Sequence, residues 1–215
     1  MLLRAFVINV ELLFALLAIG LLVGTIVALL RVYGGPFLGA LSSIYEWILL
    51  SVPALVLLFL FYFGPPQFGI SISSFLAASL ALGFRSSAYQ AQIFRGAIQA
   101  IPSGQMMAAR SLGMSRLQAI VAIVIPQAFR LSLPGWSNEF SAVIKDTTLA
   151  YAVGLNEILR HARIIMDRRY DLAMLAYLTV ALVFLVMTYA GNRTLAEIEK
   201  RVRIPGLEMP GSTVK

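Results

Sequence analysis

Long runs of apolar residues that carry almost no charge dominate this chain and restrict its fold more than any other feature. The clearest run, Leu172–Asn192, holds 21 residues without a charged side chain. Of the 215 residues, 60% are hydrophobic and 13% are charged, and soluble domains carry roughly twice that charged share. A small water-soluble core cannot enclose so much apolar surface, so we expect lipid to cover it. The sequence predicts an all-α membrane protein that forms one domain over residues 1–215.

Five apolar runs are long enough to cross a bilayer as helices, which rise about 1.5 Å per residue. Gly20 and Gly24 form a GxxxG pair that lets a second helix approach the first run closely. Pro53 lies inside the second run and is expected to kink it. The predicted spans are approximately residues 5–32, 38–63, 70–100, 134–153 and 172–192.

Positive charges in the connecting segments predict how the spans are oriented. If residues 103–126 lie in the cytoplasm, ten Lys or Arg residues lie on that side and five lie outside, which favours an outer N-terminus and a cytoplasmic C-terminus in a cell membrane. Four of the five outer charges lie within residues 160–169, and this local concentration weakens the difference in positive charge between the two sides. The ten are Arg31, Arg95, Arg110, Arg116, Arg130, Arg193, Lys200, Arg201, Arg203 and Lys215, and the five are Arg4, Arg160, Arg163, Arg168 and Arg169.

The sequence lacks the residue patterns of common enzyme and metal sites. It contains no cysteine and a single histidine, His161, so disulfides, thiolate metal sites and multi-histidine metal sites are excluded. It also lacks the glycine-rich phosphate loop, the nucleophile elbow and the zinc-protease motif. The sequence has no basic stripe interleaved with aromatic residues, so it does not indicate a nucleic-acid partner. We therefore expect a chain that is not an enzyme and that holds no metal or cofactor.

A polar segment between the third and fourth predicted spans, residues 103–126, is expected to form two short helices. Ser103 is suited to cap the first helix, Gly113 to end it, and Ser115 to precede the second. Ala109 is a strong helix former with little bulk, which allows a partner to approach closely. By spacing alone, this segment is either a surface that couples to another protein or a solvated connection between spans.

Several short strings, which cover most of the chain in the correct order, resemble the permease subunits of type I ATP-binding-cassette (ABC) importers of polar amino acids. The strings are Tyr62-Phe63-Gly64 with Pro66, Ala88-Tyr89 with Phe94-Arg95-Gly96, Ile101-Pro102-Ser103-Gly104-Gln105, Ile125-Pro126-Gln127-Ala128 with Arg130 and Pro134, and Ile144-Lys145-Asp146-Thr147-Thr148-Leu149. Two departures are that Met107 and Gln92 stand where the family has glutamates.

The resemblance implies a function and a set of partners. Residues 103–126 would be the family's cytoplasmic coupling loop, which docks on a separate ATPase dimer that holds ATP and Mg. A second copy or a homologue would complete the path, and an extracytoplasmic binding protein would deliver the amino acid. Two alternatives stay open: a permease of the same fold for another small solute, and a channel that needs no ATPase. The coupling residues so implied are Ser103, Gly104, Gln105, Met106, Met107, Ala108, Ala109, Arg110 and Gly113.

Arg85 is the sharpest candidate for a substrate contact, because an unpaired charge in a membrane span costs at least about 2.5 kcal/mol. Its guanidinium suits a substrate carboxylate, or it forms a permanent ion pair with Glu139 or Asp146. Glu139 is a candidate for the substrate ammonium. Asn138, Ser141 and Lys145 share one face of the predicted fourth span, and Glu139, Val143 and Asp146 share the adjacent face. The substrate candidates are Arg85, Tyr89, Asn138, Glu139 and Ser141.

Two further expectations concern the outer side of the membrane. Lys145 and Asp146 are interpreted as structural residues near the outer interface, where Asp146 is placed to cap the following turn. Residues 156–170 alternate apolar and charged side chains with a helical period, so they are predicted to form an amphipathic helix at the membrane surface.

Overall fold

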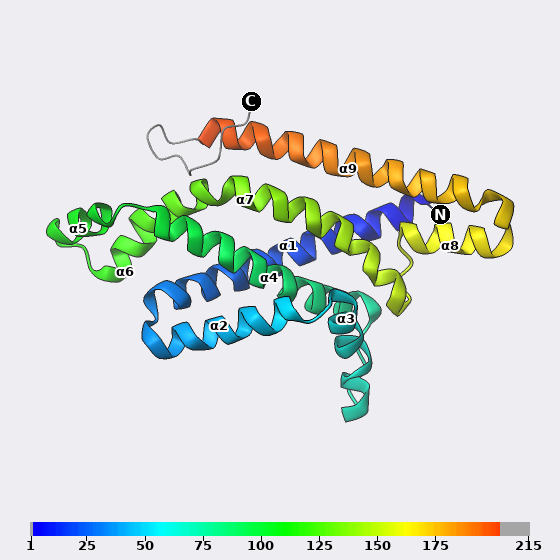
Figure 1. Cartoon of the computed structure of the whole chain (residues 1–215), viewed down its shortest axis with the longest axis horizontal. Helices are drawn as coiled ribbons and strands as arrows, with labels where there is room; N and C mark the ends of the chain where they lie inside the picture. Colours follow the sequence, from blue (N-terminus) through cyan, green and yellow to red (C-terminus); the bar gives the residue numbers. More distant parts are fainter. Residues whose placement is uncertain (1, 203–215) are drawn as a thin grey trace.

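The computed structural model describes residues 2–202, and Arg203 and Lys215 of the charge count lie outside this range. Every regular element in the described part is helical. Figure 1 shows an elongated molecule in which α1, α4, α7 and α9 follow the long axis. The α-helices are α1 (Leu2–Tyr33), α2 (Gly35–Ser51), α3 (Ala54–Phe63), α4 (Ser74–Ala100), α5 (Ser103–Ser111), α6 (Arg116–Ala119), α7 (Ile125–Asp146), α8 (Ile158–Arg168) and α9 (Ala173–Val202). Short 3₁₀ or π segments are η1 (Pro65–Phe68), η2 (Ile120–Val124), η3 (Thr147–Val153) and η4 (Tyr170–Leu172).

Three helical stretches of the described chain are long and apolar enough to cross a membrane. They are Leu3–Tyr33, Arg116–Val153 and Tyr170–Val202. The pair Gly35–Ser51 and Ala54–Phe68 passes the same requirement together, as a bent fourth span. Helix α4 has 27 residues, about 40 Å at the helical rise, but it is more polar than these stretches. The chain is therefore a multi-pass membrane protein.

The break near Pro53 is larger than a kink. α2 and α3 meet at an angle of 100°, so the kink predicted at Pro53 within residues 38–63 is present as a sharp bend. Val52 and Pro53 both have extended backbone torsion angles, and Pro53 precedes the first residue of α3. In Figure 1 α3 points away from the long axis of the molecule.

Two helices extend beyond the spans predicted for them. The fourth span was expected to begin at Pro134, but α7 begins at Ile125 and contains Pro134, because an internal proline removes one backbone hydrogen bond without ending a helix that its neighbours hold in place. The fifth span was predicted as residues 172–192, and the helix that contains it, α9, continues to Val202. Lys200 Nζ pairs with Glu197 Oε1 at 3.2 Å in this extension, where charged side chains three residues apart support helix.

The glycine pair of α1 makes the predicted close contact, and its partner is α4. A Cβ atom added at Gly24 would lie 2.8 Å from the backbone oxygen of Ser87, and one at Gly20 would lie 2.9 Å from the amide carbon of Gln90. The two helices cross near the middle of the molecule (Figure 1), and they pack against each other there. This close packing makes α1 and α4 the central pair of the fold.

A buried polar cluster joins α1 to the end of the molecule that carries α8. Asn9 Nδ2 donates to Thr147 Oγ1 at 3.0 Å and to Glu157 Oε2 at 3.4 Å, while Asn9 Oδ1 accepts from the Ile158 backbone N–H at 3.0 Å. Glu157 caps α8 by accepting from the Leu159 and Arg160 backbone N–H groups. Burial raises the pKa of Glu157, so these donors matter for holding its charged form.

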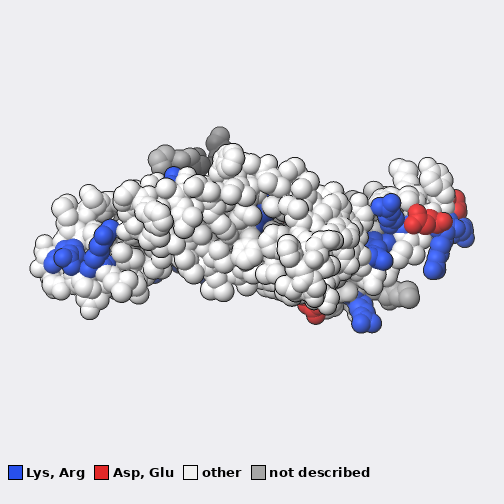
Figure 2. Space-filling view, turned by 90° about the horizontal axis from the view of Figure 1, so that it is seen from below, with Lys and Arg blue, Asp and Glu red and all other residues white. Residues whose placement is uncertain are grey.

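Charged side chains gather at the two ends of the molecule. Figure 2 shows a middle that is almost entirely uncharged, Lys and Arg at the end formed by α5 and α6, and a mixture of both signs at the α8 end. Such a distribution fits a molecule whose middle lies in hydrocarbon and whose ends lie in water.

Candidate functional site

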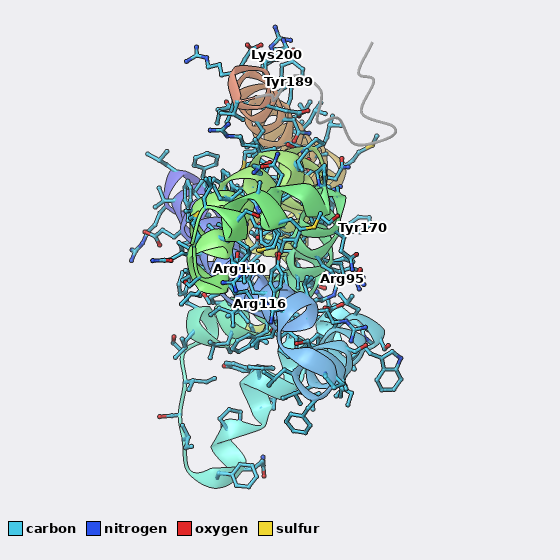
Figure 3. The ribbon with its side chains drawn as sticks, turned by 90° about the vertical axis from the view of Figure 1, so that its left-hand side faces the viewer. Arg95, Arg110, Arg116, Tyr170, Tyr189 and Lys200 are labelled. Atoms are coloured by element: carbon cyan, nitrogen blue, oxygen red, sulfur yellow. The ribbon has the colours of Figure 1, made fainter. Side chains whose placement is uncertain are left out.

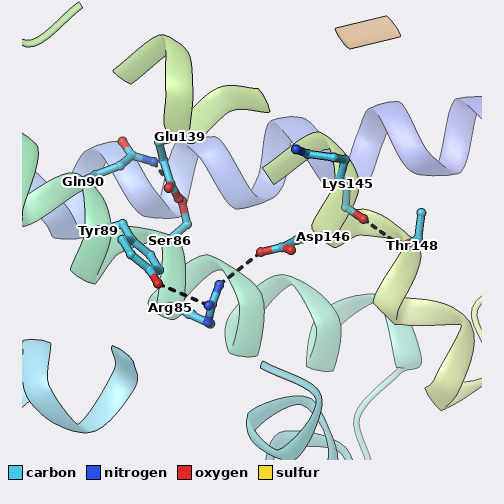
Figure 4. A network of polar contacts seen from close by, with 8 residues as sticks. All are labelled: Arg85, Ser86, Tyr89, Gln90, Glu139, Lys145, Asp146 and Thr148. Carbon is cyan, nitrogen blue, oxygen red and sulfur yellow. Dashed lines mark hydrogen bonds and ion pairs between the residues drawn. The ribbon is translucent and has the colours of Figure 1, made fainter. Parts of the chain in front are cut away.

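Arg85 lies on α4 and faces α7, where Asp146 pairs with it. Arg85 Nη1 is 3.2 Å from Asp146 Oδ2, and both side chains are partly exposed, at 22% and 32%. Arg85 Nη2 donates to Tyr89 Oη at 3.4 Å, and the guanidinium carbon lies 5.0 Å from the centre of the Tyr89 ring. Arg85 Nε is buried and has no hydrogen-bond partner. Of the two ion-pair partners predicted for Arg85, Asp146 is therefore the one that forms (Figure 4).

Glu139, which also lies on α7, is held by a different chain of hydrogen bonds. Ser86 Oγ donates to Glu139 Oε1 at 2.7 Å, and Gln90 Nε2 donates to Ser86 Oγ at 3.1 Å. Trp136 Nε1 completes the chain by donating to Gln90 Oε1 at 2.8 Å. Figure 4 shows Glu139 beside Ser86, the neighbour of Arg85, and the Arg85–Asp146 pair between the same two helices. An arginine and a second carboxylate thus lie close together inside an apolar molecule.

The other predicted substrate residues are not all part of this cluster. Tyr89 belongs to it through Arg85. Asn138 is exposed, and Ser141 Oγ donates to Asn192 Oδ1 of α9 at 2.7 Å. These two residues lie on the predicted polar face of α7, but that face turns away from α4. The structure brings together Arg85, Tyr89 and Glu139, and it separates Asn138 and Ser141 from them.

The sequence predicts that Asp146 caps the following turn, and this prediction is wrong. Asp146 is the residue before η3, but its side chain makes no capping hydrogen bond there. Its carboxylate pairs with Arg85 instead, because the face that it shares with Glu139 points towards α4. Lys145 is exposed and accepts a hydrogen bond from Thr148 Oγ1 only through its backbone oxygen (Figure 4).

Sequence reasoning missed Ser86, Gln90 and Trp136. A signal was available, because Ser86 and Gln90 are polar residues four positions apart in a membrane helix and so share one face. The contacts of Gly20 with both side chains explain why α1 carries a glycine opposite them. Nothing in the sequence indicated that Trp136 of α7 joins the hydrogen bonds between Gln90, Ser86 and Glu139.

The predicted two-helix segment, residues 103–126, is present as a hairpin. It is called the coupling hairpin after the role that the sequence resemblance implies for it. α5 ends before Gly113, whose φ of +85° favours glycine. Ser115 caps α6, and a reciprocal pair of hydrogen bonds joins it to Gln118. Ser103, however, is not a cap: Pro102 occupies the capping position, so Ser103 is already the first helical residue. η2 then connects α6 to α7 as a π segment.

The coupling hairpin exposes apolar side chains as well as arginines. Leu112 is 84% exposed, Leu117 is 70% exposed and Met107 is 63% exposed. A shallow cavity of about 520 Å³ lies on it and is lined by residues that include Leu112, Leu117 and Val121. Figure 3, which looks at this end of the molecule, labels Arg110 and Arg116 there. Exposed apolar residues with interspersed arginines are typical of a surface that another protein covers.

α8 is the amphipathic helix expected within residues 156–170, although it begins at Ile158. Ile158 and Ala162 are buried, while Arg163 and Asp167 are exposed. Its apolar face borders a cavity of about 420 Å³ that α1 and α9 also line.

Residues 20–204 match the protein family described as "Binding-protein-dependent transport system inner membrane component". The octopine transport system permease protein OccQ of Agrobacterium tumefaciens (strain Ach5) is 34% identical over 212 residues, which cover 93% of this chain and 89% of OccQ. The arginine ABC transporter permease protein ArtM of Escherichia coli (strain K12) is 37% identical over 168 residues, with coverage of 71% and 75%. The L-cystine transport system permease protein TcyB of Bacillus subtilis (strain 168) is 31% identical over 183 residues, with coverage of 85% and 78%.

Solved structures have the same fold. A crystal structure of an amino acid ABC transporter with histidines superimposes with a TM-score of 0.80 at 35% identity, covering 91% of both chains. An inward-facing structure of the MetNI methionine ABC transporter gives a TM-score of 0.76 at 21% identity, covering 95% of this chain and 97% of the other, which bears on the fold alone. The chain belongs to the permease subunits of type I ABC importers, a family in which a separate subunit hydrolyses ATP.

Proposed function

We propose that this chain translocates polar amino acids into the cytoplasm as the membrane subunit of an ATP-driven importer. The observation that carries the proposal is the cluster between α4 and α7, where Arg85 supplies a cation and Glu139, bonded to the adjacent Ser86, supplies a carboxylate. A zwitterionic amino acid needs both partners. The relatives named for octopine, arginine and cystine transport support the choice of solute class.

In this proposal Arg85 receives the substrate carboxylate. Its side chain is 22% exposed, and the two oxygens of an incoming carboxylate match the guanidinium fork. The pair with Asp146 then holds the arginine in place when no substrate is bound. Glu139 receives the substrate ammonium, with Ser86 fixing the position of one carboxylate oxygen.

The proposed topology has five spans, with the N-terminus outside and the C-terminus in the cytoplasm. α4 is the additional span, because its length suffices and its polar residues face α7 rather than lipid. The coupling hairpin then lies in the cytoplasm, and the α8 end lies outside. The net positive charge of the hairpin end supports this direction.

The proposed partners follow from this topology. An ATPase dimer docks on residues 103–113, and ATP and Mg bind to that dimer rather than to this chain. A second permease copy or a homologue lines the other half of the path. An extracytoplasmic binding protein delivers the amino acid to the α8 end. Closure of the ATPase dimer shifts the population between inward-open and outward-open states. This shift requires that the closed dimer bind one of the two states more tightly than the other.

Reconstitution tests the function. The chain is assembled with its ATPase and binding protein in proteoliposomes, and uptake of each of the twenty amino acids is measured with and without internal ATP. We expect ATP-dependent uptake of one or a few polar amino acids. ATP-dependent uptake of a different solute class would reject the amino-acid assignment, and uptake without ATP would indicate a channel instead.

A further inference from the structure

One aromatic residue joins the coupling hairpin to the central helices. Tyr33 is the last residue of α1, and it packs against the apolar cluster that contains Phe94 of α4 and Val124 of η2. Met106 of α5 packs against the same cluster. The end of α1 and the first helix of the hairpin therefore share one hydrophobic contact region.

The second half of the hairpin reaches Tyr33 by a different interaction. The guanidinium carbon of Arg116 lies 5.5 Å from the centre of the Tyr33 ring, within the range of a cation–π contact. Arg116 is the first residue of α6 and makes no ion pair among residues 2–202. The second half of the hairpin thus contacts Tyr33 itself, and the first half contacts the cluster on which Tyr33 packs.

The hairpin itself is held as one unit. Arg110 Nη1 donates to the Met114 backbone oxygen at 2.9 Å across the turn, and the Met114 N–H donates to the Ala109 oxygen at 3.2 Å. These bonds hold the turn in a protein that has Met107, and no carboxylate, where the family has a glutamate. The connection to α7, in contrast, is the π segment η2. Such segments occur mostly as single turns within α-helices and are frequent at functional sites.

We infer that Tyr33 is a positioning residue that passes displacement of the coupling hairpin to α1. Because α1 packs on α4 through Gly20 and Gly24, movement of α1 reaches the helix that carries Arg85. Loss of the contact leaves the hairpin free to move about η2 without moving α1. This inference rests on the proposed function, since it assumes that an ATPase displaces the hairpin.

The test compares Tyr33→Leu, Tyr33→Phe and Arg116→Gln in the reconstituted importer. Tyr33→Leu keeps an apolar side chain but removes the ring face, whereas Tyr33→Phe keeps both. The readouts are the ATP hydrolysed per solute taken up and the amount of ATPase that co-purifies. We expect Tyr33→Leu and Arg116→Gln each to raise the ATP used per solute several-fold, with normal co-purification, and Tyr33→Phe to match the wild type. The double variant is expected to be no worse than either single one.

If Tyr33→Leu and Arg116→Gln hydrolyse the same amount of ATP per solute as the wild type, the inference is overturned and the proposed function stays intact. Loss of the ATPase in Arg116→Gln alone would also overturn it, because Arg116 would then belong to the docking surface. A wild-type complex without ATP-driven uptake would instead reject the proposed function itself. Tyr189→Leu on α9, which is 70% exposed, serves as the control for loss of a tyrosine.

Discussion

Arg85 illustrates how a charged residue is accommodated inside an apolar molecule. Its pairing with Asp146 and its contact with Tyr89 offset part of the cost of taking it out of water. They do not satisfy the buried Nε–H. An arginine that is stabilised but not saturated with acceptors is suited to a ligand that comes and goes.

Replacement of Arg85 by Ala is expected to abolish substrate-stimulated ATP hydrolysis while assembly with the ATPase survives, because the carboxylate loses its main partner. Arg85→Lys is the matched variant: it keeps the charge but not the planar fork, so substrate affinity is expected to fall here as well. Calorimetry on the assembled complex measures the affinity. Unchanged affinity in Arg85→Ala would reject the ligand role and leave Arg85 as a structural partner of Asp146.

Glu139→Gln tests the other half of the proposed site. Gln keeps an acceptor for the Ser86 hydroxyl but removes the negative charge, so the hydrogen-bond chain is expected to persist while uptake falls. Uptake in proteoliposomes measures the effect, and Asn138→Ala on the exposed side of α7 is the control. Wild-type uptake in Glu139→Gln would remove Glu139 from the site.

Asn9 is the residue whose loss is expected to destabilise the fold most clearly without touching the substrate cluster. Asn9→Leu leaves the Ile158 N–H without its acceptor in a buried region and removes one hydrogen bond each from Thr147 and Glu157. An unsatisfied buried polar group costs about 1–3 kcal/mol. A lower melting temperature of the detergent-solubilised chain is the expected result. The control is Asn156→Leu, because Asn156 is exposed, and equal melting temperatures for the two variants would contradict the structural role of Asn9.

At the scale of elements, the contact between α1 and α4 is the one on which the others depend. It is close because glycines let the backbones approach, and it lies beside the hydrogen-bond chain that ends at Glu139. Packing between helices in a membrane relies on such small residues, since lipid is as apolar as the side chains.

Gly24→Ala and Gly96→Ala form a matched pair that tests this contact. A Cβ at Gly24 would meet backbone of α4 at 2.8 Å, whereas one at Gly96 has nothing within 4 Å. We expect Gly24→Ala to cost about 1–3 kcal/mol through overpacking and Gly96→Ala to stabilise its helix by about 0.5–1 kcal/mol. Melting temperatures in one detergent compare them, and equal values would show that α1 and α4 are not in close contact.

The sequence predicted the elements better than their ends and partners. Apolar runs indicated helices, and the spacing of Gly20 and Gly24 indicated a close contact. Pro53 predicted a bend but not its 100° angle, which depends on how α3 packs. Helical periodicity placed Glu139 and Asp146 on one face, yet it did not say which of them pairs with Arg85. Pairing across helices depends on their relative depth and rotation, which no local pattern encodes.

At the scale of the whole molecule, charge and exposed apolar surface divide the protein into three zones. The two ends carry the charges, and the middle exposes large apolar side chains (Figure 2). Helix α9 lies at the edge, where only Val180 and Phe184 of its residues are buried. The hairpin that we propose to couple to an ATPase lies at one end, and helices that follow the long axis join it to the proposed substrate cluster between α4 and α7.

The position of the coupling hairpin tests the account most directly, and the natural absence of cysteine makes the measurement simple. Leu112→Cys places one thiol at a position that is 84% exposed. A membrane-impermeant maleimide is applied to intact spheroplasts and to inside-out vesicles, without and with bound ATPase. The account predicts labelling only in inside-out vesicles and protection by the ATPase. Labelling of intact spheroplasts, or labelling of vesicles that the ATPase does not reduce, would contradict it.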